Sequence, residues 1–309
     1  MTKSTAIITH PICLLHEMGR NHPESPMRLE AVLACLRALP NQETLVWHEA
    51  TMASREALCA AHTAAHVNKI FSAAPVIDYA YLDPDTSMNP HSLAAARYAA
   101  GAVINAVDKV LAGETYNAFC AVRPCGHHAT RDEAMGFCLF NNVSVGAYHA
   151  LQNVEIQRVA ILDFDVHHGN GTEDIVARDE QILFCSAFQF PYYPMSKASV
   201  PAANIVHTPL PAQTGSAAFR AAIDATWWQP LAEFDADMII ISAGFDAHKD
   251  DPMAYFNLDE DDFAWITQQI VERTRAGGLG RVISVLEGGY DVASLGRSAA
   301  AHVMALQRG

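Results

Sequence analysis

Short, continuous runs of apolar residues recur along the chain, and each run ends abruptly in a polar or glycine-containing segment. A strand that is buried on both faces of a parallel sheet has no exposed side, so its sequence is continuously apolar rather than alternating. The pattern therefore predicts buried parallel strands at residues 6–9, 118–122, 159–164, 182–185, 238–242 and 282–286.

Longer segments of helical character lie between these runs and predict helices, including those at residues 26–39, 90–111, 141–151, 217–231 and 259–276. The first begins with Pro26, a residue favoured in the first helical turn, and carries Arg28 near its start, where the helix dipole disfavours a cation. We therefore expect Arg28 either to be solvated or to be held in place by a nearby group.

Strands that alternate with helices predict βαβ units and a parallel sheet. The chain contains no internal repeat, no low-complexity tract and no linker long enough to separate two folding units. These observations predict one α/β domain over residues 1–309.

The composition restricts the class of protein. Half of the 309 residues are hydrophobic and 17% are charged, which is typical of a globular protein with a large core. Lys and Arg total 20 against 34 Asp and Glu, and the formal charge of −14 argues against direct binding to nucleic acid. The acidic balance fits a cationic substrate or partner, and it equally fits an enzyme that is acidic for solubility.

Cysteine usage and the N-terminus predict the cellular environment. The seven cysteines include no CxxC pair, so the sequence indicates neither a disulfide framework nor a thiolate zinc site, and a reducing compartment is expected. The apolar run near the N-terminus is too short for a signal peptide or a membrane span. We therefore predict a cytoplasmic protein without membrane association.

The first chemical signal follows the predicted strand at residues 159–164. Asp163, Asp165 and His167 occupy alternate positions, so their side chains share one face while the chain is extended. Two carboxylates on one face at the end of a buried strand repel each other and lose hydration, so a cation must compensate them. An aspartate and a histidine two residues apart suit Zn²⁺, Fe²⁺ or Mn²⁺ more than Mg²⁺ or Ca²⁺.

A further ligand is predicted after the strand at residues 238–242, where Asp246 lies in a loop that Gly244 opens. Because ligands in α/β sheets gather at the carboxyl ends of strands, Asp246 and Asp165 can meet. One histidine and two aspartates leave coordination positions open for water and substrate, as a catalytic metal requires.

Two more strand ends carry candidate catalytic groups. His127 and His128 follow the strand at residues 118–122, and a pair of histidines usually indicates metal binding or proton transfer. Each imidazole needs a partner that orients it, and Asp163 and Asn170 are the candidates. Tyr290 follows the last predicted strand and two glycines, and its hydroxyl is an uncharged donor that could stabilise an oxyanion.

Together these motifs resemble the histone deacetylase family, specifically its class II and bacterial deacetylase or acetylpolyamine amidohydrolase branch. The resemblance covers nearly the whole chain through HPESPMR (22–28), RPCGHHA (123–129), GFCLFNN (136–142), DFDVHHGNG (163–171), AGFD (243–246) and EGGY (287–290). It implies the single-domain, three-layer α/β/α arginase-deacetylase fold, with a central and mostly parallel sheet of about eight strands.

The resemblance also implies an activity and a metal. The chain would be a Zn²⁺-dependent amidohydrolase, a hydroxamate-sensitive deacetylase that hydrolyses the acyl-amide of N-ε-acyl-lysine or of related acylated amines. Zn²⁺ would be held by Asp165, His167 and Asp246, a ligand set that also accepts Fe²⁺.

The family mechanism implies a role for each remaining polar group. Tyr290 would polarise the acyl carbonyl, and His128 would take a proton from the attacking water and return it to the leaving amine. His127, paired with Asp163, would act mainly through its charge, and Asn170 would lie behind His128.

Other positions are assigned to the substrate tunnel by the same resemblance. Gly136 and Phe137 would form one wall of a narrow acyl-lysine tunnel and Tyr193 the opposite wall. Asp85 would grip the substrate backbone at the rim. Met253 aligns with the position at which polyamine-specific relatives carry an acidic gatekeeper, which favours acyl-lysine over acylpolyamine substrates.

Two further sites are implied beneath the metal. Arg28 would stand beside an internal channel for acetate release. A structural K⁺ would be bound by Asp163, Asp165, His167 and Ser186, largely through backbone carbonyls.

Departures from the family pattern keep alternatives open. Cys125 replaces a second proline, which predicts a looser turn before the histidines and a thiol exposed near the metal. Residues 195–204 lack a glycine-rich stretch, which predicts an unusual rim. Asp250 and Asp251 keep an acetylpolyamine amidohydrolase possible.

Two other functions would require different residues from those of a deacetylase. An arginase-like dimanganese hydrolase would need further aspartates, whereas His168 and Asn170 follow His167. A catalytically silent acyl-lysine-binding protein would not require a complete set of metal ligands, base and tyrosine.

Overall fold

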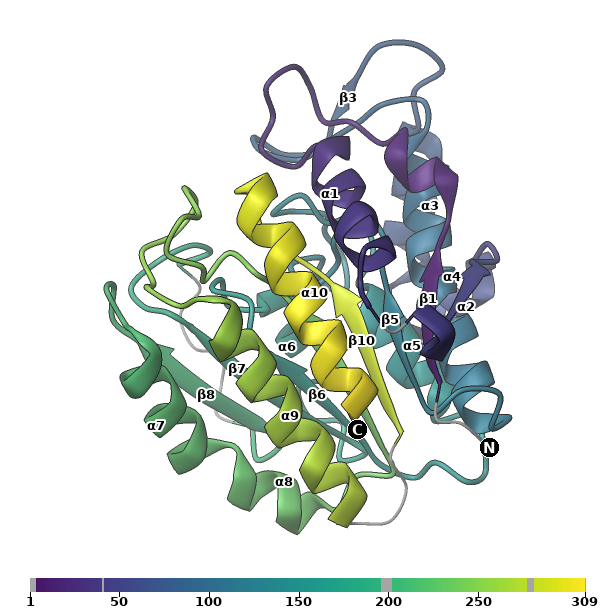
Figure 1. Ribbon diagram of the computed structural model, residues 1–309. Coiled ribbons are helices and arrows are strands. Elements are labelled where there is room, and N and C mark those ends of the chain that lie inside the picture. The colour runs from purple at the N-terminus through teal and green to yellow at the C-terminus, as the bar shows by residue number, and fades with distance from the viewer. Residues whose placement is uncertain (1–3, 41, 196–201, 277–280, 309) are drawn as a thin grey trace.

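Eight parallel strands form the centre of the structure, a computed structural model that describes residues 4–40, 42–195, 202–276 and 281–308 (Figure 1). Their order across the sheet is β2-β1-β5-β10-β9-β6-β7-β8. The bounds of the strands are β1 Thr5–Thr9, β2 Leu45–Glu49, β5 Asn117–Cys120, β6 Val159–Asp163, β7 Ile182–Gln189, β8 Ile205–Leu210, β9 Met238–Ala243 and β10 Val282–Leu286. A separate antiparallel pair is formed by β3 (Ala80–Tyr81) and β4 (Ser87–Met88).

The six strands that the apolar runs predict are confirmed as β1, β5, β6, β7, β9 and β10. Every residue of β5, β6, β7, β9 and β10 is buried, which is why their sequences are continuously apolar. The two strands of the central sheet that the pattern missed, β2 and β8, are its edge strands, and both have residues that are only partly buried. A strand with an exposed side carries a weaker apolar signal.

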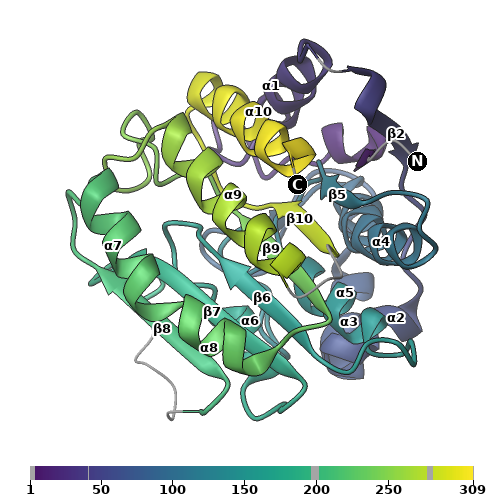
Figure 2. The same cartoon turned by 60° about the horizontal axis from the view of Figure 1, so that its bottom comes forward.

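Helices cover both faces of the sheet and make three layers (Figures 1 and 2). One layer contains α1 (Pro26–Arg37), α7 (Ser216–Thr226), α8 (Trp228–Phe234), α9 (Glu260–Ala276) and α10 (Val292–Arg308). The other contains α2 (Arg55–Ala61), α3 (Ala64–Ala73), α4 (Ser92–Leu111), α5 (Asn142–Ala150) and α6 (Asn170–Val176). Two short 3-10 helices are Pro11–Leu14 and Gln42–Thr44.

One expectation for the helices was wrong. The single helix predicted at residues 217–231 is interrupted, because α7 ends at Thr226 and α8 begins at Trp228. Trp227 between them is fully buried, and its indole N–H donates a hydrogen bond to Thr208 on β8. Four helices, α2, α3, α6 and α10, were not among those expected. Of these, α10 packs closely on α1: a Cβ at Gly296 would lie 2.8 Å from the sulfur of Cys35.

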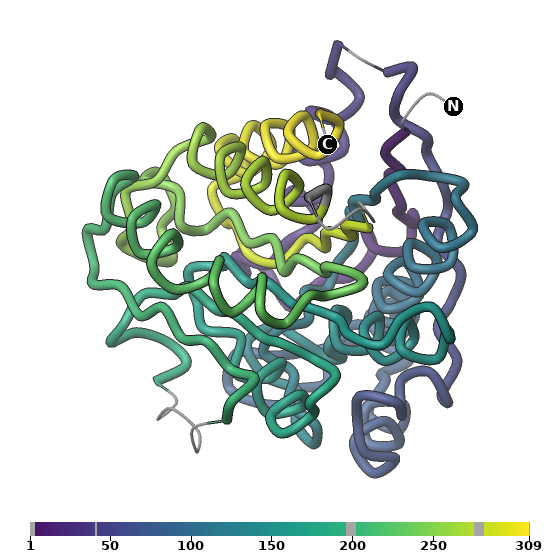
Figure 3. Tube along the Cα trace, turned by 90° about the horizontal axis from the view of Figure 1, so that it is seen from below, coloured from purple at the N-terminus to yellow at the C-terminus, as the bar shows by residue number. Residues whose placement is uncertain are grey.

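The sheet topology brings the chemical motifs together. The four strands that precede the motifs are β5, β10, β9 and β6, which are consecutive neighbours in the middle of the sheet. All run parallel, so their carboxyl ends lie at one edge of the sheet, opposite the edge seen from below in Figure 3. The loops after these strands therefore converge on one place.

Two other expectations concern the surface. Within the described ranges, no helix combines the length and apolar character that spanning a bilayer would require. Residues 196–201, most of the segment for which an unusual rim was predicted, lie outside the described residues.

Candidate metal centre and active site

The floor of the candidate site is formed by Asp165, His167 and Asp246, which the sequence predicted as metal ligands. The imidazole Nδ1 of His167 lies 3.1 Å from an oxygen of Asp165 and 3.1 Å from an oxygen of Asp246. The two carboxylates are essentially inaccessible to solvent, and the candidate ligand atoms all lie within 4.8 Å of one another. The tertiary structure thus unites residues that are about eighty positions apart in the sequence.

Two glycines make room for these carboxylates. A Cβ built at Gly244 would lie 2.0 Å from Oδ2 of Asp165, and one at Gly288 would lie 2.0 Å from Oδ2 of Asp246. Real Cβ atoms do not approach carboxylate oxygens so closely. Any side chain at either position would therefore displace a candidate ligand.

The electrostatics of this group call for a cation. Burial and the neighbouring Asp165 raise the pKa of the Asp246 carboxyl to about 7, because two buried carboxylates cannot both be ionised cheaply. Burial also opposes protonation of His167, but its hydrogen bonds to the two aspartates raise its pKa to about 10. Two carboxylates and one imidazole around a common centre match the donor types of a divalent transition metal, which would relieve this repulsion. The residues present therefore fit a catalytic metal ion.

His127 and His128 lie beside this group, and each has the orienting partner expected for it. Nδ1 of His127 is 3.0 Å from Oδ2 of Asp163, while Nδ1 of His128 is 2.7 Å from Oδ1 of Asn170. An amide oxygen only accepts hydrogen bonds, so His128 carries its proton on Nδ1 when it is neutral, and its Nε2 is left as a proton acceptor.

The two imidazoles differ in charge. Although burial opposes it, the carboxylates of Asp165 and Asp163 raise the pKa of His127 well above its usual value. Burial and the neighbouring charge of His127 lower the pKa of His128 well below its usual value. At neutral pH a cationic His127 therefore stands next to a neutral His128, whose ring centroid is 4.0 Å away.

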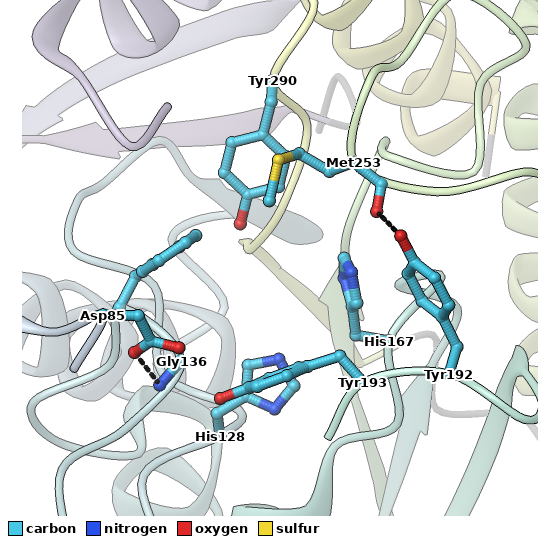
Figure 4. A pocket seen from close by; sticks show the side chains of 9 residues that line it. Asp85, His128, Gly136, His167, Tyr192, Tyr193, Met253 and Tyr290 are labelled. Atoms are coloured by element: carbon cyan, nitrogen blue, oxygen red, sulfur yellow. Dashed lines mark hydrogen bonds between the residues drawn. The ribbon is translucent and has the colours of Figure 1, made fainter. Parts of the chain in front are cut away.

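A pocket opens above the floor, and the predicted substrate-binding residues line it (Figure 4). Its lining consists of Asp85, His128, Gly136, Phe137, His167, Tyr192, Tyr193, Met253 and Tyr290. In Figure 4 the hydroxyl of Tyr290 points into the same space that the rings of His128 and His167 face. The ring of Tyr193 contacts His128 edge to face, with 5.1 Å between the centroids.

The wall opposite Tyr193 depends on an unusual backbone conformation. Gly136 and Phe137 both have positive φ angles, of 55° and 68°. A Cβ at Gly136 would lie 2.4 Å from the ring of His128, so only glycine fits against the histidine. Asp85 accepts a hydrogen bond from the Gly136 backbone N–H, and Thr86 accepts one from that of Phe137. The Asp85 loop thus holds this wall in place.

Arg28 is completely buried, so the second of the two expected alternatives holds: nearby groups keep it in place, and it is not solvated. Its guanidinium pairs with the carboxylate of Glu24 at 3.0 Å and donates to the backbone carbonyls of Glu287 and Gly289, each at 2.5 Å. The same guanidinium lies 4.8 Å from the ring centroid of Tyr290. Arg28 therefore holds the loop that carries Tyr290.

Sequence reasoning missed three site residues. Tyr192 stacks on His167, and its hydroxyl donates to the backbone carbonyl of Met253 at 2.9 Å. The buried carboxylate of Glu287 accepts the backbone N–H groups of Gly126 and His127, and burial raises its pKa to about 7. Glu24 binds two buried arginines. Glu24 lies in the motif HPESPMR (22–28) and Glu287 in the motif EGGY (287–290), so their place in these motifs could have indicated a role in the site.

Cys125 is buried, so the expected exposure of its thiol was wrong. Its sulfur lies 3.4 Å from that of Cys138, and both pack against Ala129 and Phe137. Burial raises the pKa of the Cys138 thiol well above its usual value. Both side chains are buried in one apolar cluster, so this pair packs between the histidine loop and the tunnel wall.

The residues expected to bind K⁺ are brought together beneath the metal group. Asp163 and Ser186 are paired neighbours on β6 and β7, and both side chains are buried. Asp163 also accepts the backbone N–H of Asp165 at 3.0 Å. The K⁺ site remains a prediction.

The sequence of the chain is similar to that of proteins from one known family. Residues 22–306 match the family model of the histone deacetylase domain. An uncharacterized protein of Synechocystis, slr0245, is 38% identical over 95% of this chain and 96% of its own length. A histone deacetylase-like amidohydrolase of Pseudomonas aeruginosa is 33% identical over 95% of this chain and 83% of its own length.

A solved structure supports the fold assignment. The crystal structure of the HDA15 HD domain superposes with a TM-score of 0.93 and 32% sequence identity, covering all of this chain and 89% of that domain. The predicted three-layer fold around a parallel sheet of eight strands is therefore confirmed.

Proposed function

Because the chain belongs to the histone deacetylase family, we propose that it is a Zn²⁺-dependent amidohydrolase that removes acyl groups from the side chains of lysine or from related acylated amines. One observation carries the proposal. A neutral, oriented imidazole, that of His128, and the hydroxyl of Tyr290 face one pocket, and His167, a member of the group of residues that fits a metal, lines the same pocket.

Asp165, His167 and Asp246 would hold the metal. When bound, Zn²⁺ supplies a Lewis acid for the acyl carbonyl and lowers the pKa of water; Fe²⁺ suits the same donor set. The raised pKa of Asp246 supports this assignment, because a divalent cation would replace the proton that this carboxyl otherwise needs.

His128 would be the general base and then the general acid. Its lowered pKa keeps the ring neutral at pH 7, and Asn170 leaves Nε2 available to accept a proton from the attacking water. The proton would then pass from Nε2 to the leaving amine. His127 is already cationic beside Asp163, so it would contribute positive charge rather than accept a proton.

Tyr290 would donate a hydrogen bond to the oxyanion that develops on the acyl carbonyl. Burial raises the pKa of its hydroxyl well above the usual value, so the proton needed for donation stays in place. Arg28 holds the Tyr290 loop through two backbone carbonyls, and its buried guanidinium would stand beside the path by which acetate leaves.

The rim favours acyl-lysine over acylpolyamine substrates. Met253 lines the pocket and offers no charge to a polyamine. Asp250 instead pairs with His248 and Arg297, and buried Asp251 accepts the backbone N–H groups of Tyr290, Asp291 and Met253. Neither aspartate lines the pocket. Asp85 would bind the backbone of a lysine peptide, between the walls that Phe137 and Tyr193 form.

Beneath the metal, Asp163, Asp165, His167 and Ser186 would bind K⁺, largely through backbone carbonyls. The pairing of Asp163 with Ser186 in neighbouring strands supports this site. Such an ion would stiffen the strand end that carries two of the proposed zinc ligands.

The test is hydrolysis by Zn²⁺-loaded protein of an acetyl-lysine peptide, a trifluoroacetyl-lysine peptide and N-acetylputrescine, with Tyr290→Phe as the inactive reference. We expect turnover of the lysine peptides and inhibition by a hydroxamate. Exclusive turnover of N-acetylputrescine would reverse the substrate assignment, and zinc binding without turnover of any acyl-amide would support a silent binding protein instead.

A further inference from the structure

A second group of metal-ligating side chains lies outside the pocket. Nε2 of His168 is 2.7 Å and Nε2 of His207 is 2.5 Å from the same oxygen of Glu173. His168 follows β6, Glu173 lies on α6 and His207 on the edge strand β8. None of the three lines the pocket, and none has a role in the proposed hydrolysis.

The environment of this group is enclosed except on one side. His168 and Glu173 are 6% and 3% exposed, whereas the side chain of His207 is 26% exposed. The ring of Phe188 covers His168, with 4.4 Å between the centroids. The site is therefore shielded by apolar groups but remains open to solvent at His207, which gives an ion a path of entry and leaves space for water.

The second ring nitrogen of His168, Nδ1, also has a hydrogen-bonding partner. Its Nδ1 lies 3.0 Å from the hydroxyl of Ser186, and Ser186 is paired with His207 across β7 and β8. A hydrogen bond at the far nitrogen is the arrangement that orients a metal-ligating histidine and fixes its tautomer. The Ser186 hydroxyl can accept this hydrogen bond and still offer a lone pair to K⁺ on its other side.

We infer that His168, Glu173 and His207 form a second binding site for a divalent cation of the Zn²⁺ class, independent of the proposed active-site metal. Two imidazoles and one carboxylate are a common zinc ligand set, and water would complete a tetrahedron on the open side. The three ligand atoms lie within 4.8 Å of one another.

The fit requires only a small movement. Zinc bonds of about 2.1 Å at a tetrahedral angle separate ligand atoms by roughly 3.4 Å. The present nitrogen to oxygen distances of 2.7 and 2.5 Å would therefore open by less than about 1 Å. Metal bonds would replace the two hydrogen bonds between the Nε2 atoms and Glu173. Each neutral imidazole would then carry its proton on Nδ1, and Nδ1 of His168 would donate to Ser186.

Metal stoichiometry tests the inference without reference to activity. The full chain is dialysed against buffered Zn²⁺ at constant K⁺, and metal per chain is measured by mass spectrometry. Asp246→Asn removes the proposed active-site metal, whereas Glu173→Gln removes the second. We expect each variant to lose one equivalent that the other keeps, and the double variant to lose both. The experiment therefore shows separately whether each of the two proposed sites binds a metal ion.

Two further measurements separate ligation from a purely structural ion pair. His207→Asn keeps a hydrogen-bond donor for Glu173, but an amide is a poor zinc ligand. We expect it to fold normally in chelator and to bind the second ion at least about 10²-fold more weakly. In the Asp246→Asn background, Co²⁺ should give a visible spectrum of a nitrogen- and oxygen-ligated tetrahedral ion. Stoichiometry and affinity unchanged by Glu173→Gln and His207→Asn would overturn the inference, as would an Asp246→Asn protein that binds no ion.

Discussion

The structure contains two groups of histidine and carboxylate side chains, and the neighbouring residues His167 and His168 belong one to each group. The first, Asp165, His167 and Asp246, has two carboxylates for one imidazole and reaches the pocket through His167. The second, His168, Glu173 and His207, has one carboxylate for two imidazoles and lies toward the edge of the sheet. Two histidines that are adjacent in the sequence thus contact different groups of possible metal ligands.

The two groups differ in the charge that they can balance without a metal. In the first, burial and Asp165 raise the pKa of Asp246 to about 7. In the second, burial opposes ionisation of Glu173, but the hydrogen bonds of His168 and His207 lower its pKa to about 2. The first group has an excess of carboxylate that only a cation can stabilise, whereas the histidines of the second already stabilise its single carboxylate. We therefore expect the first group to bind its metal more tightly.

The largest effect should come from Asp246→Asn. The amide keeps the side chain's size but removes half of the negative charge, so the first group should lose its metal. Turnover of an acetyl-lysine peptide should fall by roughly 10³-fold or more, because the metal's stabilisation is worth several kcal/mol. Asp250→Asn, an exposed substitution four residues away, is the control and should retain turnover. If Asp246→Asn kept near wild-type activity, the first group would not bind a metal that the reaction requires.

The next effect separates the two histidines that face the first group. His128→Ala should lower kcat by about 10²- to 10⁴-fold, because it removes the proton acceptor, and His127→Ala should cost no more than this. The acidic limb of the pH–rate profile should change in His128→Ala. His91→Ala, at an exposed position, provides the baseline. Equal and mild losses in both variants would contradict the assignment of His128 as the base.

Tyr290→Phe should have a somewhat smaller effect. It removes one donor to the developing oxyanion, which typically costs about 10²- to 10³-fold in kcat, while zinc content and thermal stability stay near wild type. Tyr81→Phe is a matched change at an exposed tyrosine. Retention of most turnover in Tyr290→Phe would exclude the hydroxyl as the polarising donor.

The smallest effect concerns the stability of the second group in metal-free protein. Glu173→Gln should lower the free energy of unfolding at neutral pH by about 2 kcal/mol, because it breaks charge-assisted hydrogen bonds. The pKa of Glu173 is lower in the folded than in the unfolded chain, so the wild-type advantage is complete above pH 4.5 and declines toward pH 2. Urea unfolding across this range, with exposed Glu180→Gln as control, measures the decline. A difference independent of pH would show that the ionised carboxylate does not stabilise the fold.

The sequence predicted the first group of metal-ligand types but not the second. Asp165 and His167 share a face because alternate residues of an extended chain do so, and the apolar strand before them indicated burial. Asp246 could be joined to them because parallel strands end at one edge of a sheet. Glu173 and His207 gave no such signal: β8 is a half-exposed edge strand that the apolar pattern missed, and only the sheet order places it beside β7.

For Arg28, too, the sequence indicated an unusual position, and only the structure gave the partners that explain it. Its position at the start of a helix was unfavourable by the dipole argument, and the sequence offered no partner to explain it. The structure supplies Glu24 one turn earlier and two carbonyls more than 250 residues away. Contacts across such separations depend on how the helices pack against the sheet, and no local pattern encodes that packing.

The sequence by itself determined six of the eight strands of the central sheet, their burial and the chemical types at four strand ends. These follow from local periodicity and from the rule that parallel strands share an edge. Only the tertiary structure decided which side chains meet: that His167 faces Asp246 while His168 faces Glu173, and that Asp251 binds backbone N–H groups rather than substrate. The reason is that a side chain's charge and partners depend on distances of a few ångströms between segments far apart in the chain.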